Sequence, residues 1–444
     1  MTYTDADLAG YVEELTGQGV RLVGGSVVDM AGVARAKYVP VERLATFHRV
    51  GMGASPCWSV FCVDGNLAFT PELNVVGDLR IRIDPADLRV VEDGVAWAPG
   101  EFHDQGGGSD DMCARSALRR AVATAADAGL TALVGAELEC PLLGPDGGHA
   151  TTGARSPYGL RTSLEQAAFL VDLTESAARV GLGLEQLHME YGQDQLEVSL
   201  SPADPLRAAD DVVLARLLLG RVAARHGMQV SFSPYPFAGE VGNGAHLHLS
   251  LATEDGPVFG GGPGPHGLTP VGEAAIAGIL DALPGLVGVY AGSVLSTVRL
   301  QPGNWAGAAL CWGLENREAA VRLVAGGPAS AHGANVELKV VDPSANPYLA
   351  VAALLASAQH GIRAGLLLPP EVPDDPAGSA ASLPALPVGQ AAVLDAFEAS
   401  PVARAVLGAP IMSGLLSVRR YEVETFPDPA APEVAEALRL SWSC

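Results

Sequence analysis

Acidic and imidazole side chains fall into three short, strand-like segments of this chain in which polar and aliphatic residues alternate, and that pattern constrains the fold more than any other feature. Successive side chains of a β-strand point to opposite faces, so the spacing predicts strands with one polar face and one aliphatic face. Glu137 and Glu139 then project together while Leu138 points away. The six positions are Glu137, Glu139, Glu190, Glu197, His246 and His248.

A fourth segment, residues 336–340, alternates in the same way and puts Glu337 and Lys339 on one face. An ordinary half-buried strand also alternates, and one such segment alone would favour that interpretation. Four in one chain favour a shared site rich in carboxylates. Carboxylate oxygens with one imidazole suit Mg2+ or Mn2+, whereas the thiolate sets of structural zinc sites are missing. The pattern predicts a site for two divalent cations and indicates an enzyme that uses a magnesium nucleotide.

The chain has 444 residues, which exceeds the roughly 250 to 300 residues that one hydrophobic core supports. We therefore expect two domains, a small N-terminal domain over residues 1–105 and a larger domain over residues 106–444. The first combines a short helix with strand-like runs and an exposed turn. These runs are residues 20–30, 60–63 and 79–83, and the turn is Trp97-Ala98-Pro99-Gly100.

Beyond the glycine-rich stretch at residues 106–110, segments with helical spacing alternate with the strands that carry the carboxylates. This order predicts an α+β fold with an antiparallel or mixed sheet backed by helices. Residues 369–387, rich in Pro, Ala and Ser, are expected to form a surface connection. The predicted helices span residues 113–128, 210–226, 269–283 and 346–361, and the last sixty residues return to helical spacing.

Charge and composition exclude several classes of partner. With 27 basic and 50 acidic residues the formal charge is −23, which argues against nucleic acid or an anionic membrane as the main partner. The six cysteines show no CxxC pairing and are expected to be reduced thiols. We find no apolar signal segment and no run of about 18 apolar residues, and so expect a soluble cytoplasmic protein.

Three arginines, Arg299, Arg317 and Arg322, lie close in sequence. A guanidinium group grips carboxylate or phosphate through paired, charge-assisted hydrogen bonds, so this segment suits an anionic substrate or a transferring phosphoryl group. A solvated surface helix that carries Arg317 and Arg322 is the structural alternative.

The order of these motifs along most of the chain resembles the glutamine synthetase family. Such a resemblance implies a small β-grasp-like N-terminal domain that contributes to the neighbouring subunit's site, and a catalytic domain with a curved antiparallel sheet. It also implies a homo-oligomer, a dodecamer of two stacked hexameric rings. The motifs are Glu-x-Glu, Glu-x6-Glu, Asn-Gly-x-His-x-His-x-Ser, Arg-Leu-x-Pro-Gly, Asn-Arg-x4-Arg, Asn-Pro-Tyr-Leu and Asp29-x2-Gly32-x2-Arg35-x-Lys37.

The resemblance also implies a role for each matching residue, with ATP and two or three Mg2+ (or Mn2+) ions as cofactors. One metal would be held by Glu139, Glu190 and Glu197, and the other by Glu137, His246 and Glu337. Arg317, Arg322 and Glu337 would be catalytic, with both arginines on the phosphoryl group. The remaining assignments are Arg299, Gly242, His246, Lys339 and Trp305 for the substrates, and His248 and Ser250 for the nucleotide.

Two departures from that family concern its ammonium pocket, which needs anionic groups to attract and deprotonate NH4+. An Asp-Gly-Ser-Ser element is absent from the corresponding region, residues 51–59, and Trp305 occupies the position of a flap glutamate. An indole cannot accept that proton, but it can form an apolar or cation-π wall for a larger amine, with Trp58 as a second wall. Alternatively, Trp305 packs under the flap. Lys339 replaces a usual arginine and keeps the charge without the paired fork.

We therefore expect an ATP-dependent ligase that joins the γ-carboxyl of glutamate to an organic amine through a γ-glutamyl phosphate. A small monoamine or amino alcohol such as ethanolamine suits the absence of further carboxylates at the entrance. The first alternative is ammonia-dependent glutamine synthesis in a rebuilt pocket. The second is an inactive sensor or scaffold that retains the fold.

Overall fold

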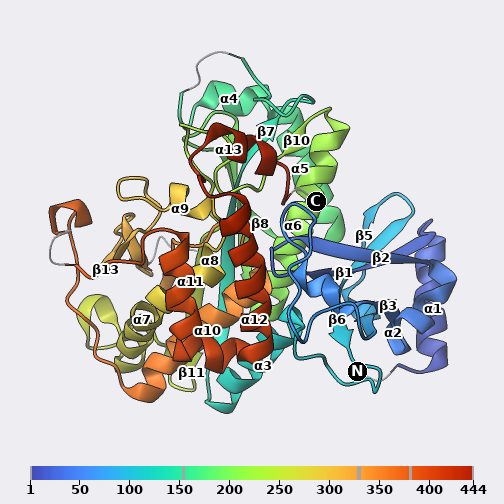
Figure 1. The fold of residues 1–444 in the computed structure, drawn as a ribbon, viewed down its shortest axis with the longest axis horizontal. Coiled ribbons are helices and arrows are strands. Elements are labelled where there is room, and N and C mark those ends of the chain that lie inside the picture. Colours follow the sequence, from blue (N-terminus) through green and yellow to red (C-terminus); the bar gives the residue numbers. More distant parts are fainter. Residues whose placement is uncertain (1–2, 153–155, 328–331, 380–382, 443–444) are drawn as a thin grey trace.

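The computed structural model describes residues 3–152, 156–327, 332–379 and 383–442, and it is built around two sheets. A small sheet from the N-terminal part lies at the right of Figure 1, and a larger sheet runs through the middle behind the C-terminal helices. The α+β class is confirmed. The chain passes from the small sheet to the larger part between the end of β6 at His103 and the start of α3 at Ala114.

The N-terminal sheet has the strand order β2-β1-β6-β4-β3, with β5 paired to β6. The pair β1 and β6 is parallel and the other pairs are antiparallel. Buried aliphatic and aromatic side chains such as Val23, Phe47 and Ile81 form its core. The elements are α1 (Asp5–Gly17), β1 (Leu22–Val28), β2 (Ala34–Pro40), α2 (Leu44–Arg49), β3 (Met52–Ala54), β4 (Leu79–Ile83), β5 (Arg89–Glu92) and β6 (Val95–His103).

Two expectations for this part are wrong. The segment from Trp97 to Gly100 is not an exposed turn but the middle of β6, where Trp97 is buried and its Nε1 donates to the Ser26 hydroxyl at 2.9 Å. Gly100 is needed there because a Cβ would lie 2.9 Å from a methyl of Ile81. Residues 60–63 form no regular strand, since a 3-10 turn ends at Val60 and only an isolated bridge follows.

The larger sheet has the strand order β13-β14-β15-β11-β7-β9-β8, with β10 paired to β7 and β12 paired to β11. Its pairs are antiparallel except for β13 and β14, which run parallel. The strands are β7 (Thr131–Leu143), β8 (Leu184–Met189), β9 (Gln195–Ala203), β10 (Gln229–Val230), β11 (Leu247–Thr253), β12 (Gly256–Pro257), β13 (Ala309–Leu314), β14 (Ala319–Val324) and β15 (Asn335–Leu338).

Helices α6, α7 and α10 contact the aliphatic face of this sheet, where Leu138, Leu247 and Leu249 are buried. The polar residues that alternate with these leucines are thereby left on the opposite face. The helices of this part are α3 (Ala114–Asp127), α4 (Leu160–Glu165), α5 (Ala167–Val180), α6 (Pro205–Arg225), α7 (Pro270–Ala282), α8 (Val287–Tyr290), α9 (Ser296–Arg299), α10 (Pro347–Ala364), α11 (Gln390–Ala399), α12 (Pro401–Thr425) and α13 (Pro432–Leu438).

The helix ends follow local sequence signals. The Asn346 side chain accepts from two backbone N–H groups at the start of α10, which ends at Gly365 in the left-handed conformation. Asp204 caps α6 and Pro205 follows it, so this helix begins five residues before the predicted start at residue 210. The carboxylate of Asp110 accepts from Met112 in the preceding turn and does not cap α3, whose N-cap is Cys113.

A buried turn joins the N-terminal hairpin to the larger part. Asp29 accepts from the backbone N–H of Val33 and pairs with Arg35 at 2.8 Å, which closes the turn between β1 and β2. Gly32 has φ 87° and faces the Ser344 carbonyl, which would lie 2.4 Å from any Cβ. The Asn346 amide donates to two carbonyls of the same hairpin. The motif from Asp29 to Lys37 therefore docks one sheet onto the other part.

Among the described residues, α12 is the one helix long and apolar enough to cross a membrane. It is interrupted at Gly408, which has φ 77°, and contains Pro410. It also packs against α10 and α11 and holds a buried ion pair between Arg419 and Glu422. These features are typical of a core helix.

The connection expected on the surface over residues 369–387 lies partly against β13. The Pro369 carbonyl accepts from the Trp312 indole at 2.8 Å, and Leu386 is buried. Residues 380–382 of this connection lie outside the described residues. Within the described part the cysteines, five in number, are free.

Candidate active site

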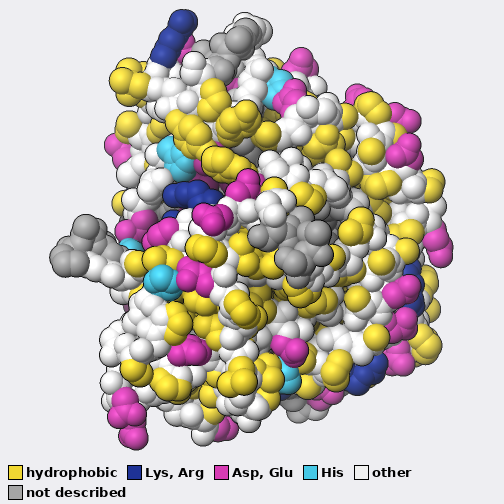
Figure 2. Space-filling model, turned by 90° about the vertical axis from the view of Figure 1, so that its left-hand side faces the viewer, with side chains coloured by type: hydrophobic (Ala, Val, Ile, Leu, Met, Phe, Trp, Pro, Cys, Tyr) yellow, Lys and Arg dark blue, Asp and Glu magenta, His cyan; other side chains and the backbone are white. Residues whose placement is uncertain are grey.

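Strand register places the predicted polar residues beside one another across the larger sheet. His248 on β11 pairs with Glu337 on β15, which in turn pairs with Arg322 on β14. On the other side of β11, Glu139 on β7 pairs with Glu197 on β9. Because paired residues share a face, one continuous polar row crosses the sheet. Figure 2 shows acidic, basic and histidine side chains gathered on one face of the molecule.

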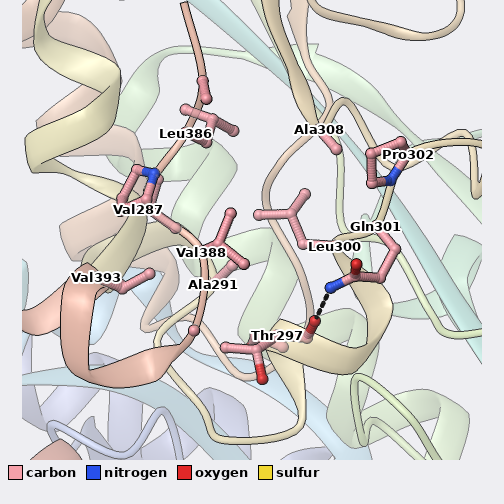
Figure 3. A pocket seen from close by; sticks show the side chains of 14 residues that line it. Val287, Ala291, Thr297, Leu300, Gln301, Pro302, Ala308, Leu386, Val388 and Val393 are labelled. Carbon is pink, nitrogen blue, oxygen red and sulfur yellow. Dashed lines mark hydrogen bonds between the residues drawn. The ribbon is translucent and has the colours of Figure 1, made fainter. Parts of the chain in front are cut away.

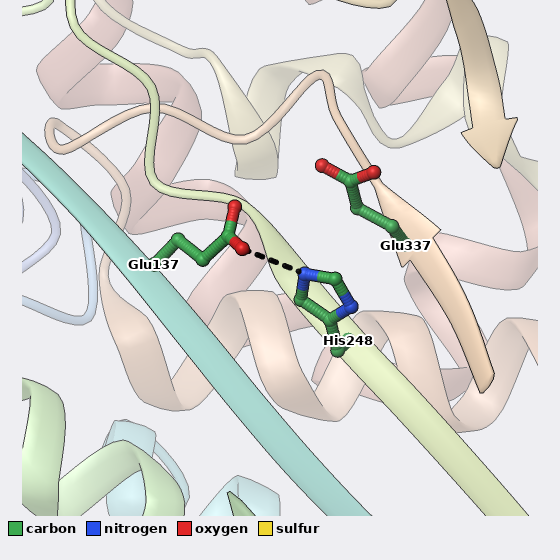
Figure 4. A group of neighbouring side chains, drawn as sticks. All are labelled: Glu137, His248 and Glu337. Atoms are coloured by element: carbon green, nitrogen blue, oxygen red, sulfur yellow. Dashed lines mark ion pairs between the residues drawn. The ribbon is translucent and has the colours of Figure 1, made fainter. Parts of the chain in front are cut away.

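The Glu137 carboxylate lies between strands β7 and β11 and meets the His248 ring at 3.3 Å (Figure 4). Glu337 completes a group of ligand atoms that all lie within 4.8 Å of one another. The second ring nitrogen of His248 contacts the Asn335 amide oxygen at 2.9 Å. Three neighbouring strands therefore direct oxygen and nitrogen donors to one point, as a divalent cation requires.

A second group of the same kind contains Glu137, Glu197 and His246. The His246 Nδ1 atom lies 3.1 Å from Glu137 and 3.4 Å from Glu337, so one imidazole links both groups. His246 precedes β11 by one residue, and its alternation with Leu247 continues the strand pattern. Glu137 therefore stands between two places where a cation could bind.

A third group contains His188, Glu190 and Glu197. The His188 Nε2 atom lies 3.0 Å from Glu190, and the ring stacks beside Tyr158. Our sequence analysis missed His188, although its spacing of two from Glu190 and its position at the end of β8 could have identified it. In the structure Glu190 and Glu197 are thus joined by an imidazole.

Glu139, which we expected beside Glu190 and Glu197, is held by other contacts and belongs to none of these three groups. Its Oε2 atom accepts from the Gly244 N–H at 2.7 Å and from the Gln195 amide at 3.2 Å. A Cβ on Gly244 would lie 2.5 Å from the His246 ring and 3.1 Å from the Arg299 guanidinium. Glycine at this position therefore lets three functional side chains converge on one small space.

The carboxylates of the row repel one another, and their pKa values move apart. Burial, followed by the charges of Glu137 and Glu139, raises the pKa of Glu197 to about 9. Burial also acts to raise the pKa of Glu137, but hydrogen bonds from His246 and His248 outweigh it and hold that pKa well below its usual range. Bound divalent cations would relieve this repulsion, so the donor set and its charge fit the metals that the sequence predicts.

This electrostatic arrangement predicts that metal binding releases a proton. With its pKa raised to about 9, Glu197 is expected to carry a proton at pH 7 in the metal-free protein, and it must lose that proton to ligate a cation. The apparent affinity for Mn2+ should therefore rise by roughly tenfold per pH unit from pH 7 towards the pKa near 9. Calorimetry in two buffers with different protonation enthalpies measures the release. An affinity that stays constant over this range would contradict the prediction.

The raised pKa of Glu197 also makes the stability of the metal-free fold depend on pH. The pKa of Glu197 in the folded protein exceeds the ordinary value of 4.5, so the metal-free fold loses stability as the pH rises from 4.5 to about 9. Added Mg2+ should offset this loss most at the upper end of that range. Glu197→Gln should remove both the proton release and this dependence on pH.

The arginines that our sequence analysis singled out have different environments. Arg322 pairs with Glu337 at 3.2 Å and with Glu315 at 2.6 Å. The side chain of Arg317 is exposed. Arg299 is buried, and its guanidinium donates to the carbonyls of Val340 and Lys339 at 3.1 Å each. Arg317 and Arg322 lie before and within β14, which contradicts the alternative of a solvated surface helix.

The remaining predicted residues surround this row. The Lys339 ammonium is buried and donates to Glu337 at 3.3 Å. The Gly242 carbonyl accepts from the Gln195 amide at 3.0 Å, beside Arg299. Ser250 follows His248 on the same face of β11. Lys339 therefore touches the row through Glu337, Gly242 lies beside Gln195 and Arg299, and Ser250 lies further along β11.

Trp305 does not pack under the flap, which is the loop between α9 and β13. Its exposed fraction is 60%, and its backbone has φ 53°, a left-handed conformation that bulky residues rarely adopt. Its N–H donates to the Glu318 carboxylate at 3.1 Å. Trp58 lies in the N-terminal part, where the Lys37 ammonium sits 5.1 Å from its ring. The indole of Trp305 is therefore free to meet a ligand, and Glu318 is a neighbour that our sequence analysis missed.

A separate cavity of about 130 Å³ is bordered by Leu300, Gln301 and Pro302 (Figure 3). Apolar side chains such as Leu300, Leu386 and Val393 line it, and the Gln301 amide donates to the Thr297 carbonyl at 2.6 Å at its edge. No carboxylate or imidazole is among its lining residues. It is therefore not part of the polar row.

Comparison with known proteins finds relatives that align with nearly the whole chain. Residues 111–436 match the family model described as glutamine synthetase, catalytic domain. The chain is 38% identical to gamma-glutamylpolyamine synthetase GlnA3 of Streptomyces coelicolor over 97% of its own length and 95% of that protein. The chain belongs to the glutamine synthetase family. It is also 31% identical to a glutamine synthetase of Mycolicibacterium smegmatis, over 80% of this chain and 83% of that one.

Solved structures of the glutamine synthetase family share this fold. A structure described as a novel glutamine synthase homolog superposes with a TM-score of 0.86 at 29% identity, over 96% of this chain and 99% of that one. Ligand-free GmaS superposes with a TM-score of 0.84 at 27% identity, over 94% of this chain and 96% of that one. The chain is a ligase of the glutamine synthetase type, a family that uses ATP, divalent metals, glutamate and an amine substrate.

Proposed function

We propose that this ligase joins the γ-carboxyl of glutamate to an organic amine, giving a γ-glutamyl amide, ADP and phosphate. The exposed Trp305 indole carries the proposal, because the resemblance to the family places it where a flap glutamate usually follows Arg-Leu-x-Pro-Gly-x. An uncharged ring cannot attract NH4+ and accept its proton in the way a carboxylate does, but it can contact the carbon chain of a larger amine. The relative named for polyamines supports an organic acceptor.

Two kinds of acceptor amine are compatible with this proposal, and a different observation supports each. A small monoamine or amino alcohol such as ethanolamine fits our sequence analysis, which found no set of carboxylates for a second ammonium group. A polyamine is favoured by the name of the Streptomyces relative. The two differ in the number of positive charges that the entrance must neutralise, so a comparison of monoamines with diamines separates them.

The chain's own groups account for the chemistry of such a ligation. A γ-carboxylate is a poor electrophile, so it must first take a phosphoryl group from ATP and become an acyl phosphate. We assign Arg317 and Arg322 to the phosphoryl oxygens, and Arg299 and Lys339 to the carboxylate groups of glutamate. The amine, once it has lost its ammonium proton to solvent, then bonds through nitrogen to the acyl carbon as the bond from that carbon to the phosphate oxygen breaks, and the departing phosphate takes up the second proton that the nitrogen loses.

Two or three divalent cations would be held by the residues of the polar row. When bound, such cations neutralise phosphate charge and favour transfer of the phosphoryl group. We propose Glu137, His246 and Glu337 for one ion and Glu190 and Glu197 for another, with Glu139 beside the second. His248, to which the resemblance gives a role at the nucleotide, lies 3.3 Å from Glu137 in a group of possible metal ligands with Glu337 and is a further metal-ligand candidate.

We further propose a cytoplasmic homo-oligomer, a dodecamer of two stacked hexameric rings. Apolar side chains that a monomer leaves in water support an assembly, since Phe69, Val75 and Val76 are between 49% and 77% exposed. Light scattering on the purified protein measures the subunit number.

An acceptor panel tests the proposed function. Phosphate release is measured with glutamate, Mg-ATP and one of ammonium, ethanolamine, a longer monoamine or a diamine, and the γ-glutamyl products are identified by mass. An organic amine should saturate the enzyme at a far lower concentration than ammonium does. Saturation by ammonium at low concentration would favour glutamine synthesis. Absence of turnover with every acceptor would favour an inactive sensor.

Trp305→Glu should shift the preference towards ammonium. The substitution restores a carboxylate at the flap, which binds NH4+ and accepts its proton, and it removes the apolar wall for the amine. We expect the ratio of kcat/KM for the organic amine to that for ammonium to fall by roughly tenfold or more, the effect of one charge-assisted hydrogen bond. Trp305→Gln, which removes the ring without adding charge, is the matched control. An unchanged acceptor profile in Trp305→Glu would contradict this account of selectivity.

A further inference from the structure

A carboxylate lies directly under the residue that replaces the flap glutamate. Glu318 Oε1 accepts the Trp305 N–H at 3.1 Å, and this contact holds the flap in its left-handed conformation at Trp305. Two residues further on, the backbone at Gly307 passes so close to Lys339 that a Cβ would lie 2.7 Å from the Lys339 Cβ. The charge of Lys339 acts on Glu318. Glu318 therefore contacts the flap through the Trp305 backbone and lies within the electrostatic influence of Lys339.

Glu318 has no cationic partner of its own. Over the ranges that the structure describes, no lysine, arginine or histidine lies within ion-pair distance of this carboxylate, whereas nearby Glu315 and Glu337 both hold Arg322. Its side chain is half-buried, and that burial raises its pKa. Its second oxygen, Oε2, accepts no hydrogen bond from the residues described. A half-buried carboxylate without a counter-charge is the group that a cationic ligand would complete.

We propose that Glu318 supplies the negative charge that binds the ammonium group of the acceptor amine. This inference rests on the proposed function and names the residue that selects the charged end of the acceptor. An organic amine reaches the site protonated, and a carboxylate that accepts the Trp305 backbone N–H offers it charge-assisted hydrogen bonds, while the exposed indole of the same residue is available for a cation-π contact. Glu318 follows Arg317 directly in sequence. The turn that contains Glu318 therefore supplies the negative charge that the flap lacks at Trp305.

Glu318→Gln tests this assignment with little change in shape. The amide oxygen can still accept the Trp305 N–H, but the charge is gone. The KM for ethanolamine and for a diamine should rise by roughly tenfold to a hundredfold, the range of one charged hydrogen bond. The KM values for glutamate and ATP should not change. The rate with hydroxylamine, which is uncharged at neutral pH, should stay at the wild-type value because that nucleophile needs no counter-charge.

Asp375→Asn is the matched control. Its carboxylate acts on Glu318 through space, but it accepts a hydrogen bond from Ala377 and touches neither Trp305 nor Glu318 within hydrogen-bond distance. This variant should change the KM for amines by less than about twofold. Thermal unfolding checks that both variants fold. If Glu318→Gln is unstable, Glu318→Asp, which keeps the charge on a shorter side chain, should retain more amine affinity than Glu318→Ala.

Three results would overturn the proposal: an unchanged KM for amines in Glu318→Gln, an equal loss with hydroxylamine, or an equal effect of Asp375→Asn. A failure of the proposed function would give a result that can be told apart from these three. If the wild-type enzyme accepts only ammonium, amide formation with organic amines is wrong. A raised KM for ammonium in Glu318→Gln would then still assign the cation site to Glu318.

Discussion

Glu337→Gln should lower kcat by about a hundredfold to a thousandfold or more, the scale expected when a group that stabilises transferring charge is lost. Glu337 lies within 3.4 Å of His246, Lys339 and Arg322. An amide of the same size keeps the shape but cannot neutralise two cationic side chains or ligate a cation as strongly. Phosphate release measures the rate, and Mn2+ calorimetry should show one ion fewer per subunit or a much weaker site.

Glutamine is the informative substitution because it keeps the side-chain volume, whereas alanine would also leave a cavity. The Lys339 and Glu337 side chains are 6% and 2% exposed, so either variant loses about 3 to 5 kcal/mol by breaking a buried charged pair, and thermal unfolding must accompany the rate measurement. Glu371→Gln is a suitable control, since Glu371 also pairs with a histidine, His266 at 2.7 Å, but outside the polar row. Wild-type turnover and metal stoichiometry in Glu337→Gln would exclude Glu337 as a ligand.

Arg317→Ala should reduce phosphoryl transfer by about a thousandfold or more, the effect of losing an arginine from a transferring phosphoryl group. Arg317 is exposed, so its loss should leave the unfolding temperature unchanged. Single-turnover formation of ADP with glutamate and Mg-ATP isolates this step from the attack of the amine. Arg317→Lys keeps the charge without the planar guanidinium group, so its rate of ADP formation should lie between those of the wild-type enzyme and Arg317→Ala.

Two comparisons sharpen the interpretation of Arg317. Arg120→Ala removes another exposed arginine, on α3, and should leave the rate unchanged. Arg322→Ala should lower both the rate and the stability, because Arg322 is a partner of Glu337 and Glu315. If Arg317→Ala retains the wild-type rate of ADP formation, Arg317 lies outside the phosphoryl site.

Local geometry explains why much of the polar row could be predicted. Alternation along a strand depends only on the backbone of that strand, so Glu137, Leu138 and Glu139 take their expected faces without knowledge of the rest of the fold. The α+β class follows from the order of such segments. The grouping of ligands depends instead on register between strands that are distant in sequence. The pairs of His188 with Glu197 and of His248 with Glu337 are therefore findings of the structure.

The errors also have physical causes. Pro99 and Gly100 are usual turn residues, but they lie in β6 because Gly100 allows close packing against Ile81. Glu318 was missed because it occupies a variable position of its motif, and only the fold of the flap brings it to Trp305. Contacts between segments override local preference in both cases.

Gly244 limits how this centre could be altered. A single added methyl group would collide with an imidazole, crowd a carboxylate at 3.0 Å and press on a guanidinium. The backbone at Gly244, which carries no side chain, therefore limits the size of the ion and substrate that fit there, together with the side chains that would bind them. Engineering towards bulkier acids must widen the opening elsewhere, since position 244 has no room to give.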